Sequence, residues 1–92
     1  MLKKNELKKL ALNECVKMIG GDFISGHKDK CAEYYGYADD KHFKYTLCID
    51  TKDNENFIIG ANVPFDYYAR VLVNVKTGEV TRDYENSVLP SM

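Results

Sequence analysis

Residues 68–85, YARVLVNVKTGEVTRDYE, decide the fold of this 92-residue chain. Valines alternate with other residues up to Lys76, and the alternation resumes two residues after Gly78. A period of two is typical of a half-buried strand. The break suits a tight turn of type I in which Gly78 takes the left-handed conformation and forms a bulge. We therefore predict a β-hairpin with strands over about 68–76 and 79–85.

The N-terminal part predicts one helix, from about 5 to 19, lying across one face of a sheet. Its apolar residues recur at spacings of three and four, the pattern of an amphipathic helix. Asn5 suits the N-cap, and Gly20-Gly21 suits the stop. The apolar stripe consists of Leu7, Leu10, Ala11, Cys15, Met18 and Ile19, widened by Leu12 and Val16.

Three further strands are predicted between the helix and the hairpin. Their ranges are about 32–38, which is rich in tyrosine, about 43–50, which alternates cleanly, and about 56–61, which ends before Pro64. Residues 22–30 are predicted to form a loop with Phe23 and Ile24 facing inwards, and the tail from Asn86 is predicted to be loose. The whole chain, 1–92, then forms one α+β domain. Its N-terminal helix packs on one face of a four- to five-stranded antiparallel meander.

Metal sites are not favoured by the residue spacing, so we expect no cofactor. His27, Cys31, His42 and Cys48 are chemically suited to zinc, but no closely spaced ligand pair is present among them. The acidic stretch 50–56 concentrates oxygen ligands, yet Lys52 occupies the third position of an EF-hand pattern and no glycine occupies the sixth. The simpler interpretation is ordinary loop histidines, buried thiols and a solvated loop.

Catalytic arrangements are equally poorly supported, and we expect a protein that is not an enzyme. Cys31 beside His27 or His42 is the pairing that could give a nucleophile. Asp39-Asp40 is a turn signature rather than a converging carboxylate pair.

The cysteine count and the N-terminus favour a cytoplasmic protein. Cys15, Cys31 and Cys48 are odd in number, which favours reduced thiols, and the first residues lack the apolar run of a signal peptide.

The seven tyrosines point instead to a protein-binding surface. Tyr34 and Tyr35 must face opposite sides of a strand, so one of them points away from the helix. The alternative is that the rings pack the second sheet face and only their hydroxyls reach water. The residues that we expect to contact a partner are Tyr35, Tyr37, Asp66, Tyr67, Tyr68 and Arg70.

The C-terminal hairpin resembles the closing motif of PepSY-type domains through Val73, Val75, Thr77, Gly78 and Val80. That resemblance covers about fifteen residues and implies a regulator or inhibitor of peptidases. The size and the tyrosine-bearing sheet also resemble small immunity proteins of bacterial toxin systems, which implies neutralisation of a toxin. No residue role carries over from either family.

These observations together predict a small, bacterial, cytoplasmic, non-enzymatic module that binds or inhibits another protein, with a toxin-neutralising immunity protein as the concrete form. The alternatives are a PepSY-like peptidase regulator and a phage or mobile-element inhibitor of a nucleic-acid-targeting complex that acts by acidic mimicry. A formal net charge of −1 disfavours nucleic acid as a partner, and no stretch is long and apolar enough for a membrane span. A homodimer through an edge strand is compatible with any of these.

Overall fold

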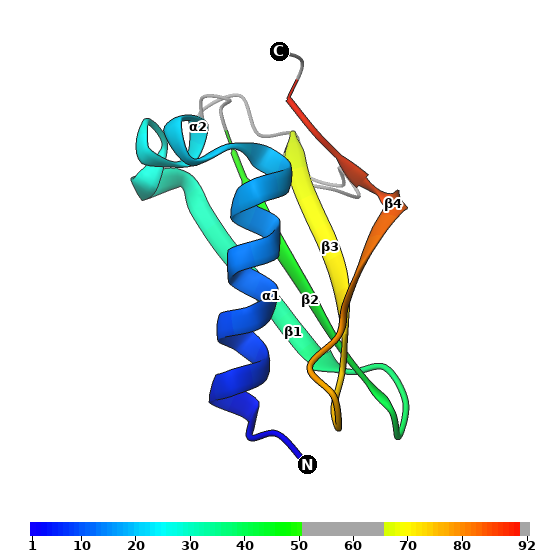
Figure 1. Cartoon of the computed structure of the whole chain (residues 1–92). Coiled ribbons are helices and arrows are strands. Elements are labelled where there is room, and N and C mark those ends of the chain that lie inside the picture. The colour runs from blue at the N-terminus through cyan, green and yellow to red at the C-terminus, as the bar shows by residue number, and fades with distance from the viewer. Residues whose placement is uncertain (51–65, 91–92) are drawn as a thin grey trace.

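A computed structural model describes residues 1–50 and 66–90, and they form the predicted α+β arrangement (Figure 1). The four strands make one antiparallel sheet in the order β1-β2-β3-β4, a simple meander. In chain order, the elements are α1 (Lys4–Ile19), α2 (Gly21–Ser25), the 3-10 turn η1 (Lys28–Lys30), β1 (Cys31–Tyr37), β2 (His42–Ile49), β3 (Tyr67–Asn74) and β4 (Val80–Val88). The strand predicted over about 56–61 lies outside the described residues.

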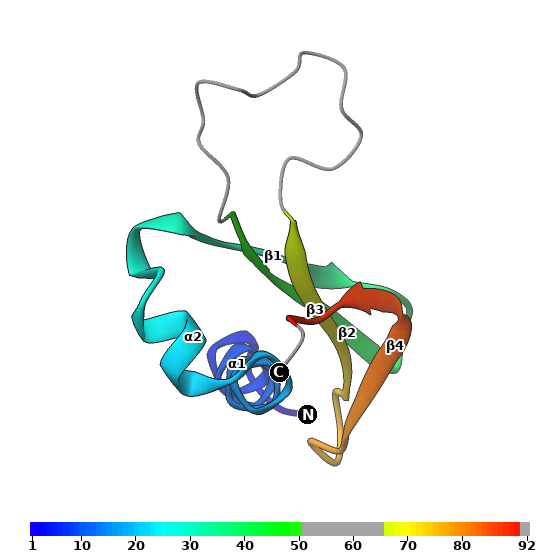
Figure 2. The ribbon, with the colours of Figure 1, turned by 90° about the horizontal axis from the view of Figure 1, so that it is seen from above.

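Helix α1 packs against the sheet along a stripe of four buried residues. Leu7, Ala11, Cys15 and Ile19 recur every four residues and are buried. The predicted stripe is wider than the contact, because Leu10 and Leu12 are exposed. Both helices lie on the same side of the sheet (Figure 2).

The helix begins one residue earlier than predicted, and its N-cap is Lys3 rather than Asn5. The extended residue Lys3 directs its backbone N–H to Oε1 of Glu6 at 3.4 Å, one half of a capping box. Just before it, the N–H of Leu2 donates to the carbonyl of Val75 at 2.8 Å. This tertiary hydrogen bond fixes the chain entry, and the sequence pattern could not reveal it.

The prediction of a loop over residues 22–30 was wrong. Helix α2 and η1 occupy most of it, and only Gly20, with φ 107°, separates α1 from α2. Phe23 and Ile24 do face inwards and pack against the core, as predicted. A five-residue helix is too short to display a helical period, and this explains why the pattern was missed.

The hairpin of β3 and β4 contains the predicted glycine turn. Gly78 has φ 77°, and its N–H donates to the carbonyl of Asn74 at 2.9 Å. Strand β4 continues to Val88, whereas the sequence predicted its end at 85 and a loose tail from Asn86. The extension exists because Val88 pairs with Tyr68 and because Oγ of Ser87 accepts the backbone N–H of Arg70 at 2.9 Å.

The core lies between α1 and one face of the sheet. Every second residue of the two central strands faces the helix, as predicted. These buried strand residues are Phe43, Tyr45, Leu47 and Ile49 in β2, and Ala69, Val71 and Val73 in β3, followed by Val75. Burial follows this alternation in β3, whereas in β2 Thr46 and Cys48 on the opposite side are buried as well. Within the described ranges, no helix has the length and apolar character needed to cross a membrane.

Candidate partner-binding surface

Strand β1 displays three large exposed rings. Tyr34, Tyr35 and Tyr37 have exposed fractions of 57%, 42% and 58%. Tyr35 pairs with Tyr45, and Tyr37 with Phe43, so both lie on the helix side of the sheet. Tyr34 pairs with Thr46 and lies on the opposite side. In the described part of the chain β1 pairs with β2 alone, so it is an edge strand whose three rings stay exposed.

Tyr35 is held in place from three directions. Its ring stacks with that of Tyr45 at 6.3 Å between centroids. The Nζ atoms of Lys8 and Lys4 lie 4.2 and 5.2 Å from the ring centroid of Tyr35, within the range of cation–π attraction. The helix therefore adds two positive charges to the tyrosine side of β1.

Glu33, the carboxylate of β1, is neutralised by its neighbours. Its Oε2 accepts a hydrogen bond of 2.6 Å from the hydroxyl of buried Tyr45, and Nζ of Lys8 lies 3.2 Å from Oε1. The hydrogen bond from Tyr45, and then that from Lys8, lower the pKa of Glu33. Burial and the carboxylate raise the pKa of Tyr45 above its ordinary value. These bonds join β1, β2 and α1.

The opposite side of the sheet has a row of paired residues, Tyr34, Thr46 and Arg70. Nε of Arg70 donates to Oγ1 of Thr46 at 3.1 Å, which orients the guanidinium along the sheet. Beside this row Gly36 pairs with the exposed Lys44.

A hollow of about 320 Å³ lies next to Gly36. The Cβ atom of an alanine at position 36 would meet no atom within 4 Å, so the space above this residue is open. We call the lining of the hollow the β1 surface. The lining residues are Tyr34, Tyr35, Gly36, Tyr37, Lys44, Thr46 and Arg70.

The structure divides the six expected contact residues between the two sides of the sheet. Tyr35, Tyr37 and Tyr67 lie on the helix side, whereas Tyr68 and Arg70 lie on the other side. Asp66 precedes β3. Three of the six, Tyr35, Tyr37 and Arg70, belong to the β1 surface.

Tyr67 is a packing residue. It is partly buried against the core, and its ring meets that of Phe23 edge-on at 5.3 Å. Sequence reasoning omitted Tyr34, Gly36 and Lys44 from the contact residues. The strand alternation around Tyr34 was the signal that could have found Tyr34.

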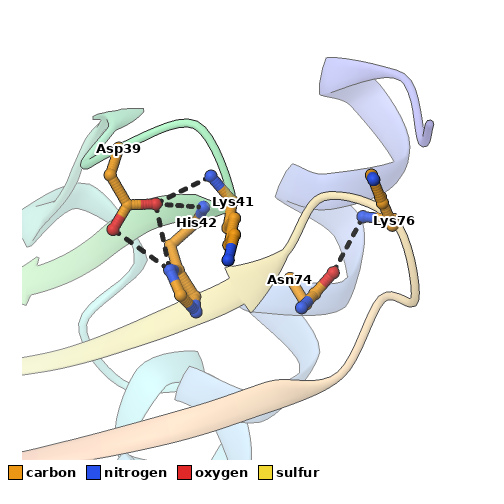
Figure 3. Close-up of polar contacts among 5 residues, drawn as sticks. All are labelled: Asp39, Lys41, His42, Asn74 and Lys76. Carbon is orange, nitrogen blue, oxygen red and sulfur yellow. Dashed lines mark hydrogen bonds and ion pairs between the residues drawn. The ribbon is translucent and has the colours of Figure 1, made fainter.

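The two sheet turns at the N-terminal end of α1 are held by local polar contacts (Figure 3). Oδ1 of Asp39 accepts the backbone N–H groups of Lys41 and His42 at 2.7 and 2.8 Å, and it lies 3.0 Å from Nδ1 of His42. These bonds, led by that of Lys41, lower the pKa of Asp39. In the neighbouring turn, Oδ1 of Asn74 accepts the N–H of Lys76 at 2.9 Å. Asp39 therefore caps its own turn.

The four residues considered for zinc are not assembled. Cys31 lies near His27, whose carbonyl accepts its thiol at 3.2 Å, but His42 lies at the other end of the β1–β2 hairpin. Cys48 faces the opposite side of the sheet from Cys31. Residues 1–50 and 66–90 contain no group of three metal-ligating side chains. Most of the acidic stretch 50–56 lies outside these ranges.

Burial makes the thiols poor nucleophiles. It raises the pKa of Cys15 to about 12 and also raises the pKa of Cys31 and Cys48. The thiol of Cys15 donates to the carbonyl of Ala69 at 3.4 Å, a packing role between α1 and β3.

Comparison with known proteins returned no match to a protein-family model, to a curated protein or to a solved structure.

Proposed function

We propose that this chain is a non-enzymatic module that binds and inhibits another protein through the β1 surface. The observation that carries the proposal is the display of three tyrosines, each more than two-fifths exposed, on one edge strand beside Lys44 and Arg70. Tyrosine and arginine are the residue types that most often dominate the energy of protein interfaces. The concrete form that we favour is a toxin-neutralising immunity protein.

The tyrosines are pre-organised for binding. All seven residues of β1 are paired with β2, so its backbone is fixed before a partner arrives. The Tyr35 ring is held by Tyr45 and Lys8, and the Tyr37 ring meets Phe43 edge-on at 5.5 Å. Because ordering side chains at an interface costs about 0.5–1.5 kcal/mol each, rings that are already fixed retain more of their contact energy.

The other functions have less support. Acidic mimicry of nucleic acid needs a surface of unneutralised carboxylates, whereas the β1 surface carries cations and Glu33 is bonded to Tyr45 and Lys8. A cysteine enzyme needs a low thiol pKa, and burial raises it for all three thiols. A PepSY-like regulator would use the Gly78 hairpin, where the side chains of Asn74 and Thr77 cap the turn and Arg82 is paired with Glu14.

The test is affinity capture from a lysate of the source organism with the purified chain as bait. A variant carrying Tyr34→Ala and Tyr37→Ala serves as the negative bait. Tyr84→Ala is the matched control, because Tyr84 is 57% exposed, as is Tyr34, but lies on the opposite edge strand. We expect one stoichiometric protein that binds wild type and the control and is lost from the double variant.

The inhibitory role is then tested by measuring the activity of the captured protein with and without the chain. A captured protein retained equally by all three baits contradicts the β1 surface as the binding site. A partner whose activity is unchanged by the chain contradicts inhibition.

A further inference from the structure

Among residues 1–50 and 66–90, no strand pairs with the outer side of β1, whose backbone groups can bond to a further strand. In an antiparallel pair, alternate residues exchange hydrogen bonds with the partner strand. At the two ends of β1, the N–H of Asp50 donates to the carbonyl of Lys30 at 3.0 Å and the N–H of Ala38 donates to the carbonyl of His42 at 2.9 Å. Even-numbered residues therefore point their backbone groups towards β2. The backbone groups of Glu33, Tyr35 and Tyr37 point away from the sheet.

Cations flank this edge on both sides of the sheet. Lys4 and Lys8 lie over the Tyr35 ring on the helix side. Lys44 and Arg70 lie on the opposite side. An extended segment placed along β1 would direct alternate side chains to these two sides. The charges on both sides suit carboxylates.

We propose that an extended acidic segment of the partner adds to β1 as a further antiparallel strand of the sheet. This rests on the proposed function and names the part of the partner that is recognised. The backbone of the segment bonds to Glu33, Tyr35 and Tyr37, which supplies affinity without sequence preference. Carboxylates of the segment face Lys4 on one side, where Lys8 is already paired with Glu33, and Lys44 on the other side, which supplies specificity.

The hollow above Gly36 gives one of these carboxylates its place. Because Gly36 has no side chain, a side chain of the added strand can cross over it towards Lys44, its neighbour in β2. Arg70, one strand further in, adds positive charge to the same hollow. Gly36→Val should close this route while leaving the β1–β2 hydrogen bonds in place.

A second copy of this chain fits the edge less well. An antiparallel pair of β1 strands would place both copies of α1 on the same side of one continuous sheet. Lys4 and Lys8 of the two copies would then face one another across the junction, because both lie over Tyr35 near the middle of β1. Like charges at a junction oppose association.

The first experiment measures amide hydrogen exchange by NMR on the ¹⁵N-labelled chain with millimolar peptide. The probes are a nine-residue peptide that repeats Glu-Glu-Thr-Thr, so that Glu side chains point to both sides of the added strand, and its counterpart in which Lys replaces Glu. We expect the Glu peptide to slow exchange at Glu33, Tyr35 and Tyr37 by at least tenfold. The amides of Tyr34 and Gly36, already bonded to β2, should not change. The Lys peptide should slow none of them.

Variants separate the backbone contact from the ring contact. Tyr37→Pro removes an outward N–H without breaking the pairing with β2, and Tyr37→Ala removes the same ring but keeps the N–H. We expect the Glu peptide to bind Tyr37→Pro at least tenfold more weakly than Tyr37→Ala. Lys4→Glu should weaken binding several-fold, and Lys9→Glu, with the same charge change on the exposed side of α1, should not. The melting temperatures identify any variant that fails to fold.

Three results would overturn the proposal. They are equal effects of the two peptides, no slowing with either, and slowing that rises with protein concentration in the absence of peptide, which would assign the edge to a second copy. Failure here is distinguishable from failure of the proposed function. A captured partner that is lost from the Tyr34→Ala, Tyr37→Ala bait but retained by Tyr37→Pro keeps the binding function and rejects strand addition.

Discussion

The two edge strands of the sheet differ in the regularity of their pairing with the neighbouring strand. Strand β1 runs in unbroken register with β2. Strand β4 is interrupted, since its pairing with β3 passes from Asp83–Arg70 to Val88–Tyr68, and residues 84–87 lie opposite Ala69 alone. A bulge of this kind bends and twists an edge strand. The sheet is thus regular at one edge and irregular at the other.

Side chains reinforce this difference. At the β4 edge, Nε of Arg82 donates to Oε2 of Glu14 at 2.6 Å, and the carboxylate of Asp83 bonds to Asn86. Leu89, just beyond the strand, packs against the core. Charges, bulges and covering contacts are the means by which proteins protect edge strands from unwanted pairing. The β1 edge carries the ion pair of Glu33 with Lys8, but its pairing has no bulge, and three tyrosines and a glycine make up most of the strand. This contrast supports the proposal that the β1 edge receives a partner.

The largest expected effect separates a core tyrosine from an edge tyrosine. Tyr45→Ala should lower the free energy of unfolding by about 3–5 kcal/mol, because it empties a fully buried aromatic site. Tyr37→Ala should lower it by about 1 kcal/mol, since it removes mainly the edge-on contact with Phe43. Urea denaturation of both variants measures the difference. Equal losses would mean that β1 tyrosines serve the core, which would remove the contrast between the edges.

The next largest effect is the difference in stability between alanine substitutions at two glycines. Gly78→Ala should lower the free energy of unfolding by about 1–2 kcal/mol, because its left-handed backbone disfavours a side chain. The new Cβ would also lie 3.1 Å from the Cδ1 atoms of Leu2 and Leu10. Gly36→Ala is the matched control. Its Cβ meets open space, so stability should stay within about 0.5 kcal/mol of wild type. A large loss at Gly36 would contradict the hollow on the β1 surface.

The smallest effect is the pH dependence of the contact between β1 and the core. The pKa of Glu33 is lowered in the folded state, so ionised Glu33 stabilises the fold above its unfolded pKa of about 4.3. That contribution is lost as the pH falls through the lower folded pKa. We expect Glu33→Gln to melt slightly below wild type at pH 7 and the gap to close near pH 3. A gap independent of pH would show that the charge of Glu33 does not matter.

The regular parts of the fold followed from local patterns. The valine alternation predicted β3, the glycine in the turn predicted the hairpin, and the apolar stripe predicted α1, each within one or two residues at most ends. These elements repeat a period long enough to recognise. Helix α2 was missed because it is only one turn long, and the end of β4 was missed because its last residues are held by Arg70 and Tyr68 of another strand.

The candidate surface was predicted only in outline. Sequence reasoning identified tyrosines on strands as contact residues, and Tyr35, Tyr37 and Arg70 lie together on the β1 surface. It grouped them with Tyr67, whose ring packs on Phe23. The sequence could not separate these tyrosines, because the exposure of each ring depends on where α1 crosses the sheet. Gly36 and Lys44 carried no signal of their own. Their importance arises from the hollow that their pairing creates.

The sequence by itself determined the α+β class, the Gly78 hairpin and which side of each central strand is apolar, because these depend on periodicity and on backbone conformation within a few residues. Only the tertiary structure decided which strands lie at the edges, how far α1 covers the sheet and which tyrosines remain exposed. Those properties depend on contacts between residues distant in the chain. The outward-facing backbone groups of β1 and the cations on both its sides belong to this second group.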